Sequence, residues 1–188
     1  MTRETAGAST PPMLKHWREV KAQRPDTILF YRVGDFYEMF YQDAELAARV
    51  LEIALTSRGD GVPLAGVPVK AAAEYLRQLV SAGHRVAICE QVEDPRLAKG
   101  LVRREVVETV TPGAMLQEGW LTGARNNWMV AFCEGGLAAI DLSTGEFLLE
   151  TLPTGALPEA LSRLAPAEVA LPADAELALD DGVMRTAR

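Results

Sequence analysis

The stretch Thr27-Ile28-Leu29-Phe30-Tyr31-Arg32-Val33-Gly34-Asp35-Phe36-Tyr37-Glu38-Met39-Phe40 decides the fold of this chain. Its first half, residues 27–33, is an apolar run bounded by a proline and a glycine, and it predicts a buried strand. Asp35 and Glu38 have the spacing of a capping box, so we expect an amphipathic helix to begin here and to continue through Leu55. This arrangement places Phe36 in the first helical turn.

Two interpretations of this helix start compete. A glycine, a large apolar ring and a carboxylate at the mouth of one helix could form a small recognition site that faces out of the fold. Alternatively, Asp35 and Glu38 only satisfy free backbone N–H groups, and Phe36 belongs to the core. Periodicity favours the second interpretation, because buried aromatic side chains are common.

Composition is that of a soluble globular protein. The 188 residues are 48% hydrophobic and 24% charged, which fits one domain or two small ones. No apolar run approaches the ~20 residues that a membrane helix needs, so we expect no membrane association. The polar segment Met1–Pro12 has no apolar core of a secretory signal. Cys89 and Cys133 lie in apolar runs without metal-type spacing, which predicts buried, reduced thiols in a cytosolic protein.

The net charge of −7 is unevenly distributed along the chain. Residues 14–113 contain 14 Lys and Arg against 14 Asp and Glu, whereas residues 114–188 contain 4 against 11. A nucleic-acid surface is therefore expected in the first part. A basic run in that part has no acidic interruption and consists of Arg96, Lys99, Arg103 and Arg104. A solvated loop explains this run equally well.

Strands alternate with helices through the first part of the chain, which predicts an α/β fold. After a flexible tail, a first helix carries Leu14, Trp17 and Val20 on one face. The later elements are expected as a strand at 62–67, a helix at 71–82, a strand at 85–92 and an edge strand at 103–110.

The second part predicts a smaller unit after a linker at 114–126. Residues 127–152 indicate three antiparallel strands with turns at Gly135-Gly136 and Ser143-Thr144-Gly145, and a helix at 157–164 and a strand at 168–171 follow. This βββαβ order resembles the opening of a ribonuclease-H-like domain. The remaining chain is too short to complete such a fold, so we expect a truncated domain with an exposed sheet edge and suspect a fragment.

Residues 14–113 resemble the mismatch-recognition domain of the MutS family of DNA mismatch repair proteins. The matching stretches have the family's order and spacing, and they are Phe30-Tyr31-Arg32-Val33-Gly34-Asp35-Phe36-Tyr37-Glu38, Pro63-Leu64-Ala65-Gly66-Val67-Pro68, Val86-Ala87-Ile88-Cys89-Glu90-Gln91-Val92 and Val110-Thr111-Pro112-Gly113. The resemblance implies a flexible tail at 1–13, a mixed-sheet α/β mismatch-recognition domain at 14–113, a linker at 114–126 and the N-terminal part of a connector domain at 127–188.

The resemblance also assigns functional residues. It implies that Phe36 and Glu38 are the Phe-x-Glu pair that inserts from the minor groove and contacts a mispaired or unpaired base in duplex DNA, the first step of mismatch repair. Arg58, Lys99 and Arg104 are the candidates for contacts to the DNA backbone, and Lys99 matches the family least well. No catalytic residue, metal ligand or cofactor ligand is expected in this chain.

Features of the whole family lie outside this chain. The sequence has no Gly-x-x-x-x-Gly-Lys-[Ser/Thr] motif, so it offers no P-loop for ATP. The resemblance implies that the parent protein is an ATPase that binds ATP and Mg²⁺ in a missing domain. It also implies a homodimer formed through missing C-terminal regions and a bacterial, cytoplasmic location at the nucleoid.

Two alternative functions remain. The acidic second part could dock downstream repair proteins, which would make the chain a protein-interaction module with weak DNA contact. A ribonuclease-H-like nuclease is the other alternative, with Asp141 and Glu146 as its carboxylates. These two residues flank a tight turn and are poorly placed to share a metal ion, so an Asp-initiated turn is the favoured interpretation.

Overall fold

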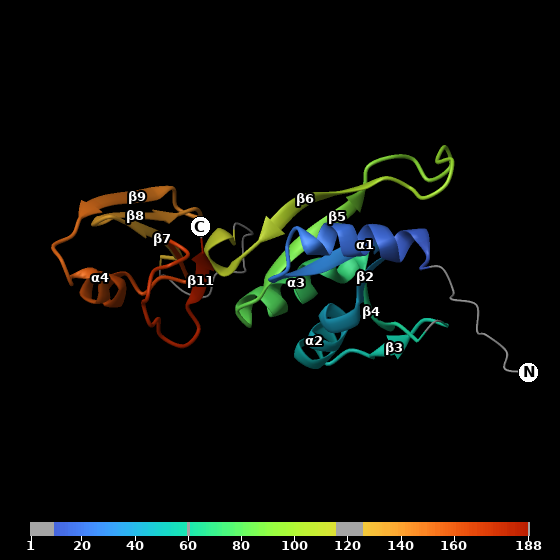
Figure 1. The fold of residues 1–188 in the computed structure, drawn as a ribbon, viewed down its shortest axis with the longest axis horizontal. Helices are drawn as coiled ribbons and strands as arrows, with labels where there is room; N and C mark the ends of the chain where they lie inside the picture. Colours follow the sequence, from blue (N-terminus) through green and yellow to red (C-terminus); the bar gives the residue numbers. More distant parts are fainter. Residues whose placement is uncertain (1–9, 60, 116–125, 188) are drawn as a thin grey trace, which may run out of the picture.

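The computed structural model describes residues 10–59, 61–115 and 126–187, which form two sheets with helices packed against them (Figure 1). The first sheet has six strands in the order β3-β4-β2-β1-β5-β6. The elements of this part are α1 (Pro12–Ala22), β1 (Thr27–Val33), β2 (Phe36–Phe40), α2 (Tyr41–Leu51), β3 (Thr56–Ser57), β4 (Pro63–Pro68), the 3₁₀ turn η1 (Val69–Ala71), α3 (Ala72–Ser81), β5 (Arg85–Gln91), β6 (Arg104–Val110) and η2 (Pro112–Ala114).

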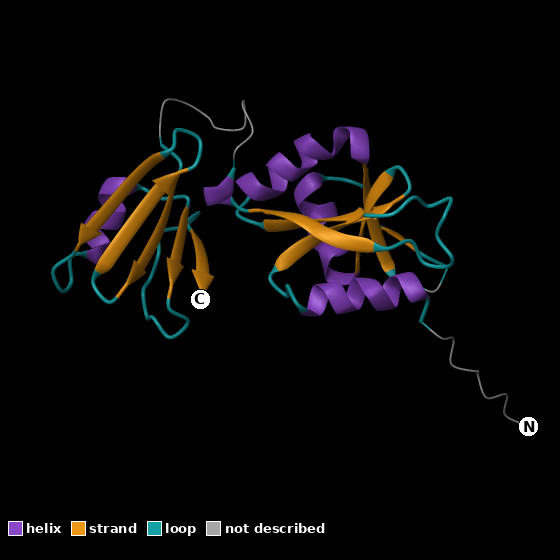
Figure 2. Ribbon diagram, turned by 90° about the horizontal axis from the view of Figure 1, so that it is seen from above, coloured by secondary structure: helices purple, strands orange, loops and turns teal. Residues whose placement is uncertain are grey.

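Helices cover both faces of the first sheet (Figure 2). On one face, α1 contributes Leu14 and Trp17 to a cluster with buried residues of the sheet, namely Leu29, Tyr31, Phe40, Ala87 and Cys89. On the other face, α2 and α3 pack against a larger cluster that includes Ile28, Phe30, Tyr37, Met39, Val67 and Val86. Alternation along each strand thus sends successive side chains into two different cores.

The predicted element order of this part is largely confirmed. The strand at 27–33 is β1, and the helix at 71–82 and the strand at 85–92 agree with α3 and β5 to within one residue at each end. The strand at 103–110 lies at the sheet edge as β6. These elements are specified by their own apolar periodicity, so local patterns suffice to find them.

The predicted helix start at Asp35 is wrong. Residues 36–40 form the central strand β2, which pairs antiparallel with both β1 and β4, and the helix begins only at Tyr41. Val33 pairs with Phe36, so Gly34 and Asp35 form a two-residue hairpin turn, and Gly34 has the positive φ of 57° that such a turn requires. The aromatic-rich stretch therefore follows its strand preference, and the capping-box spacing is coincidental.

The second sheet has five strands in the order β11-β10-β7-β8-β9. Its elements are β7 (Trp128–Cys133), β8 (Gly136–Asp141), β9 (Glu146–Thr151), α4 (Leu157–Leu164), β10 (Glu168–Leu171) and β11 (Met184–Ala187). The helix α4 packs on one face, where Ala160 joins Trp128, Val130, Leu137 and Val169. Helix α4 and strand β10 begin and end at the predicted residues.

Two predictions for this part need correction, and one strand was not predicted. The first hairpin turn lies at Glu134 and Gly135, since Gly136 already belongs to β8. Strand β11 was missed, because it is specified by its parallel pairing with β10 rather than by a pattern of its own. Cys133 is exposed, whereas Cys89 is buried as expected.

Short polar contacts join the two sheets near η2. The Gly113 N–H donates to Glu168 Oε2 over 3.3 Å, and the Asn127 side-chain amide donates to the Pro112 carbonyl over 2.8 Å. Glu168 is itself buried and accepts a hydrogen bond from the Thr186 hydroxyl. Arg85 at the start of β5 also donates to Thr186. The η2 segment and the start of β5 are therefore tied to β10, to the edge strand β11 and to the residue that precedes β7.

The chain is a mixed α/β protein, which confirms the predicted fold class. The ribonuclease-H-like character of the second part stays a prediction, and so do the boundaries at 13, 113 and 126. Residues 1–9 of the predicted tail and 116–125 of the predicted linker lie outside the described residues. Among the helices that the structure describes, none is both long and apolar enough to cross a membrane.

Candidate nucleic-acid interface

Phe36 lies at the rim of the first sheet, immediately after the β1–β2 turn. It is the first residue of β2, it pairs with Val33 on one side and Pro68 on the other, and it is 46% exposed. The Val69 N–H donates to the Asp35 carbonyl over 2.9 Å, so the turn is also held from the β4 side. A large apolar ring is thus presented to solvent on a firmly paired strand, and the interpretation of Phe36 as a core residue does not hold.

Glu38 follows two residues later and faces the same side of the sheet as Phe36. Its carboxylate is mostly buried, and its Oε2 accepts no hydrogen bond although this atom is shielded from solvent. Burial raises the pKa of Glu38, and the charges of Arg58 and Arg104 oppose that rise. A buried carboxylate oxygen without a hydrogen-bond donor gains from a new donor or from taking up a proton.

Arg58 is the charged partner that the structure places beside Glu38. It lies in the turn between β3 and β4, where its N–H donates to the Val62 carbonyl and its carbonyl accepts from Gly61. Its Nη1 is 3.5 Å from Glu38 Oε2, and its guanidinium lies 5.9 Å from the centre of the Phe40 ring. The side chain is about one-third exposed, so Arg58 can contact a ligand at this rim while it faces Glu38.

Lys99 lies exposed in the long loop between β5 and β6. The base of this loop is closed by the Val92 N–H, which donates to the Arg103 carbonyl, and by the Arg103 N–H, which donates to Glu93. Arg103 is exposed as well and forms an ion pair with Glu105. The predicted basic run is therefore largely a solvent-exposed loop.

Arg104 is the exception in that run, and its burial argues against the predicted contact to the DNA backbone. It is only 6% exposed, and its guanidinium donates to the Arg32 and Val102 carbonyls over 2.7 Å each. It also lies 5.0 Å from the centre of the Tyr31 ring. The pairing of β6 with β5 turns this side chain inward, so Arg104 binds backbone carbonyls of β1 and of the segment before β6, and its charge acts on Glu38.

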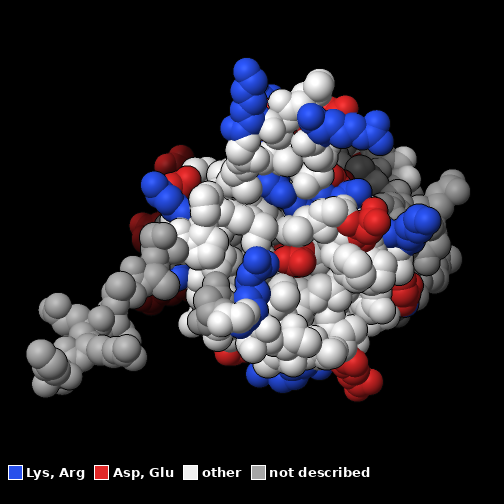
Figure 3. Space-filling view, turned by 90° about the vertical axis from the view of Figure 1, so that its right-hand side faces the viewer, with Lys and Arg blue, Asp and Glu red and all other residues white. Residues whose placement is uncertain are grey.

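The rim that carries these residues presents charges of both signs. Figure 3 shows the end of the first sheet with the β3–β4 turn and the β5–β6 loop, where Lys and Arg side chains lie among Asp and Glu side chains. The excess of acidic residues in the second part lies elsewhere in the chain. Exposed Lys and Arg side chains at the end of a sheet that also presents an aromatic ring suit a polyanion that offers flat apolar surfaces.

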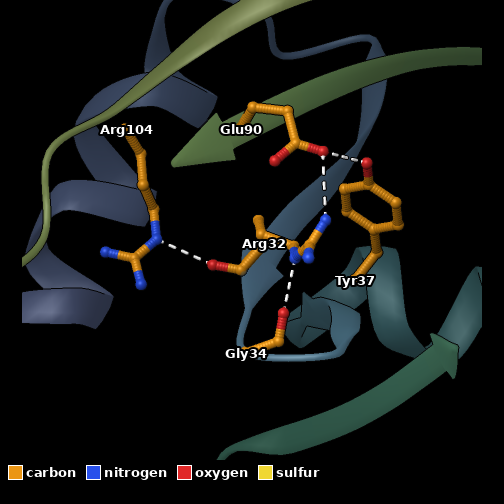
Figure 4. Close-up of polar contacts among 5 residues, drawn as sticks. All are labelled: Arg32, Gly34, Tyr37, Glu90 and Arg104. Carbon is orange, nitrogen blue, oxygen red and sulfur yellow. Dashed lines mark hydrogen bonds and ion pairs between the residues drawn. The ribbon is translucent and has the colours of Figure 1, made fainter. Parts of the chain in front are cut away.

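Sequence reasoning missed a polar cluster on the opposite face of the sheet from Phe36. Arg32 of β1, Tyr37 of β2 and Glu90 of β5 contact one another directly behind the turn (Figure 4). The alternation of side chains along two paired strands would have predicted that Arg32 and Tyr37 share one face of the sheet. Because a helix was expected from Asp35, these two segments were not expected to pair.

Asp141 serves the turn between β8 and β9. One carboxylate oxygen accepts from the N–H and the hydroxyl of Ser143, and the other accepts from the Asn127 N–H. Burial acts to raise the pKa of Asp141, but these hydrogen bonds hold it below its ordinary value. In the ranges 10–59, 61–115 and 126–187, no cluster of three or more His, Cys, Asp and Glu side chains could hold a metal ion. The Asp-initiated turn therefore accounts for this residue.

Comparison with known proteins identifies the family of this chain. Residues 11–119 match the family model described as MutS domain I. The chain belongs to the MutS family. The MutS domain I stretch includes the complete first sheet and every candidate residue at its rim.

Several bacterial relatives named DNA mismatch repair protein MutS are similar over most of the chain. The protein of Desulfosudis oleivorans is 47% identical over 188 residues, which cover 95% of this chain and 21% of the relative. The protein of Brevibacillus brevis is 50% identical over 153 residues, covering 77% and 18%. That of Rhodopseudomonas palustris (strain HaA2) is 44% identical over 190 residues, covering 90% and 21%. The chain thus spans about a fifth of the length of these MutS relatives.

Proposed function

We propose that this chain recognises mismatched or unpaired bases in duplex DNA for mismatch repair, by inserting Phe36 from the minor groove with Glu38 beside it. One observation supports this proposal most strongly. A half-exposed phenylalanine stands at a rigid sheet rim, next to a carboxylate whose buried Oε2 has no hydrogen-bond donor. The MutS family membership is consistent with it, since the curated relatives are named DNA mismatch repair proteins.

Deformability of DNA supplies the selectivity in this proposal. An apolar side chain that unstacks a base step costs a few kcal/mol and kinks the duplex. A mispaired step has already lost pairing and stacking, so its deformation costs less. One rim can therefore accept many different mismatches without contacts specific for each base. Stacking of Phe36 on a base contributes about 1–3 kcal/mol.

Glu38 contributes hydrogen bonding to the displaced base. An ionised carboxylate beside DNA phosphates is repelled, but a protonated carboxyl donates a hydrogen bond to a base acceptor. Partial burial already raises the pKa of Glu38, and the approach of DNA buries it further. The proton is therefore expected to be taken up as the complex forms.

Arg58, which lies beside Glu38, and the exposed Lys99 are the proposed contacts to the DNA backbone, whereas the buried Arg104 supports the sheet from within. Since the chain spans only part of its relatives, ATP and Mg²⁺ binding, homodimerisation, downstream repair partners and a cytoplasmic, nucleoid-associated location are proposals for the whole protein. In the experiments below, "full-length protein" means a protein of the relatives' length that contains this chain.

The test compares DNA affinities of the full-length protein and its Phe36→Ala variant at one salt concentration. Wild-type protein should bind a duplex with one mismatch or unpaired base more tightly than matched duplex, and the variant should bind both alike. Equal preference in both proteins would show that Phe36 does not recognise the mismatch.

A protein-interaction role is the second candidate for the second sheet. Phe147 and Leu149 on the edge strand β9 are strongly exposed in the described structure, and the surrounding part of the chain is acidic. Such an apolar strand face suits contact with other protein surface. If this role replaced DNA recognition, Phe147→Ala would impair repair in cells while Phe36→Ala left mismatch binding unchanged.

A further inference from the structure

Three strands bring a polar row together behind the β1–β2 turn. Arg32 of β1 pairs with Tyr37 of β2, so both side chains share one face of the sheet. On the other side of β1, Tyr31 pairs with Cys89 in parallel register, and Arg32 and Glu90 each follow this pair by one residue. The row Glu90–Arg32–Tyr37 therefore crosses β5, β1 and β2 on the face opposite Phe36.

Direct contacts connect the row to the turn. Glu90 Oε1 accepts hydrogen bonds from the Tyr37 hydroxyl and from Arg32 Nη1, the latter over 3.4 Å (Figure 4). Arg32 Nε donates to the carbonyl of Gly34, the turn residue with positive φ. The Arg32 guanidinium also lies 5.7 Å from the centre of the Tyr37 ring. One guanidinium thus joins the turn backbone to a carboxylate on β5.

We propose that Arg32, Tyr37 and Glu90 form a positioning clamp that holds the β1–β2 turn, and with it Phe36, in the geometry needed to enter a mismatched base step. This inference rests on the proposed function of Phe36. Tyr37 directly follows Phe36 in the chain, so a hydroxyl fixed to Glu90 restrains the backbone on which the Phe36 ring is mounted. Charge-assisted hydrogen bonds of this kind fix direction as well as distance.

The protonation state of Tyr37 agrees with this role. Burial, followed by the hydrogen bond and the charge of Glu90, raises the pKa of Tyr37 to about 12. Tyr37 therefore remains a hydrogen-bond donor to Glu90 throughout the neutral range.

Loss of the clamp should lower the preference for mismatched over matched DNA more than it lowers the affinity for DNA in general. Contacts to phosphate supply most of the affinity for matched DNA and tolerate small shifts of one turn. Insertion of Phe36 requires a defined geometry of the turn. Without the clamp, the turn must be ordered when the complex forms, and the entropy cost of this ordering lowers the affinity for mismatched DNA only. Partly exposed ion pairs contribute little to stability, so loss of the clamp should not unfold the protein.

The test measures mismatch-over-matched affinity ratios of the full-length protein with Tyr37→Phe, Glu90→Ala and Glu90→Gln. Tyr37→Phe and Glu90→Ala should each lower the ratio about fivefold, the effect of one net hydrogen bond, with matched affinity and salt slope unchanged. Glu90→Gln keeps an acceptor for the Tyr37 hydroxyl and should retain more of the ratio. The double variant Tyr37→Phe/Glu90→Ala should lose little more than Glu90→Ala alone.

A control and a structural readout make the test decisive. Glu74→Ala breaks the exposed Arg77–Glu74 ion pair on α3 and should leave the ratio unchanged. Fluorescence of 2-aminopurine beside the mismatch should report weaker unstacking with Tyr37→Phe, and amide exchange at Asp35 and Phe36 should become faster. If Glu90→Ala fails to fold, the conservative Tyr37→Phe variant decides.

Each result distinguishes the clamp from the proposed function. If Phe36→Ala removes mismatch preference while Tyr37→Phe and Glu90→Ala keep it, the clamp is overturned and the function stands. Equal losses on matched and mismatched DNA would show a purely structural role and also overturn the clamp. Retained preference with Phe36→Ala would instead refute the proposed function.

Discussion

Truncation of Phe36 separates recognition from stability. Changing a fully buried Phe to Ala lowers the free energy of unfolding of a protein by about 3–5 kcal/mol. Phe36 already has 46% of its surface in water and lies at the rim, so we expect Phe36→Ala to cost only about 1–2 kcal/mol through lost apolar burial. Loss of stacking on the base, about 1–3 kcal/mol, should lower mismatch affinity about 5- to 150-fold and leave matched affinity unchanged.

Two reference variants calibrate this prediction. Phe147 on β9 is 61% exposed, so Phe147→Ala should cost about as little stability as Phe36→Ala and leave mismatch preference intact. Phe30 is fully buried in the first sheet, and Phe30→Ala should show the large loss typical of a core position. Chemical denaturation of the 188-residue chain measures the stabilities, and fluorescence anisotropy of the full-length protein measures the affinities. A Phe36→Ala variant as unstable as Phe30→Ala, with mismatch preference retained, would return Phe36 to the core and refute the argument.

Five further predictions concern Glu38, the exposed cations Arg58 and Lys99, the junction at Gly113 and the chain alone. Glu38→Gln should retain mismatch binding, whereas Glu38→Ala should lose the hydrogen bond and bind matched DNA more tightly; equal behaviour of the two variants in anisotropy would exclude the hydrogen bond. Because burial raises the pKa of Glu38, the native state binds its proton more tightly than the unfolded state, so stability should fall as pH rises from the ordinary towards the raised value; denaturation of Glu38→Gln should lack this slope. Arg58→Ala and Lys99→Ala should each weaken both DNAs about equally and reduce the salt slope of log K by about 1, and a loss confined to mismatched DNA would indicate base or bend recognition instead. Gly113→Ala should lower the thermal unfolding temperature markedly, since an added Cβ would lie 2.8 Å from Glu168 Cβ and 3.0 Å from Met129 Cβ; an unchanged melting curve would show that the junction yields easily. The 188-residue chain alone should bind mismatched duplex only in the non-specific range, ~10⁻⁴–10⁻⁶ M at physiological salt, and should hydrolyse no ATP, so nanomolar selective binding would contradict the need for a larger clamp around DNA.

Local patterns were sufficient for the elements that carry their own periodicity. The apolar run at 27–33, the amphipathic helix at 157–164 and the short strand at 168–171 were all predicted at their observed residues. The resemblance to the MutS family also identified Phe36 and Glu38 as candidate residues from the sequence. These elements are encoded by neighbouring residues, and the tertiary contacts of this fold agree with those local preferences.

Pairing between distant segments decided what the local pattern could not. The capping-box spacing of Asp35 and Glu38 predicted a helix, but β1 and β4 both offer hydrogen bonds to residues 36–40 and make them a strand. Arg104 resembled its exposed neighbours in sequence, and only the register of β6 against β5 turned it inward. A short motif records the preferences of one segment, whereas strand pairing is determined by the free energy of many contacts across the whole sheet.

The chemistry of the site likewise arose from the tertiary structure. Arg58 lies 20 residues after Glu38, and Glu90 lies 53 residues after Tyr37, yet each pair is in contact at the same rim. Spacing along the chain carries no sign of such contacts. The sequence therefore determined which side chains are available for the proposed DNA recognition. The folded sheet determined which charges face Glu38 and which polar groups contact the turn before Phe36, because burial and electrostatic interaction depend on distances in space.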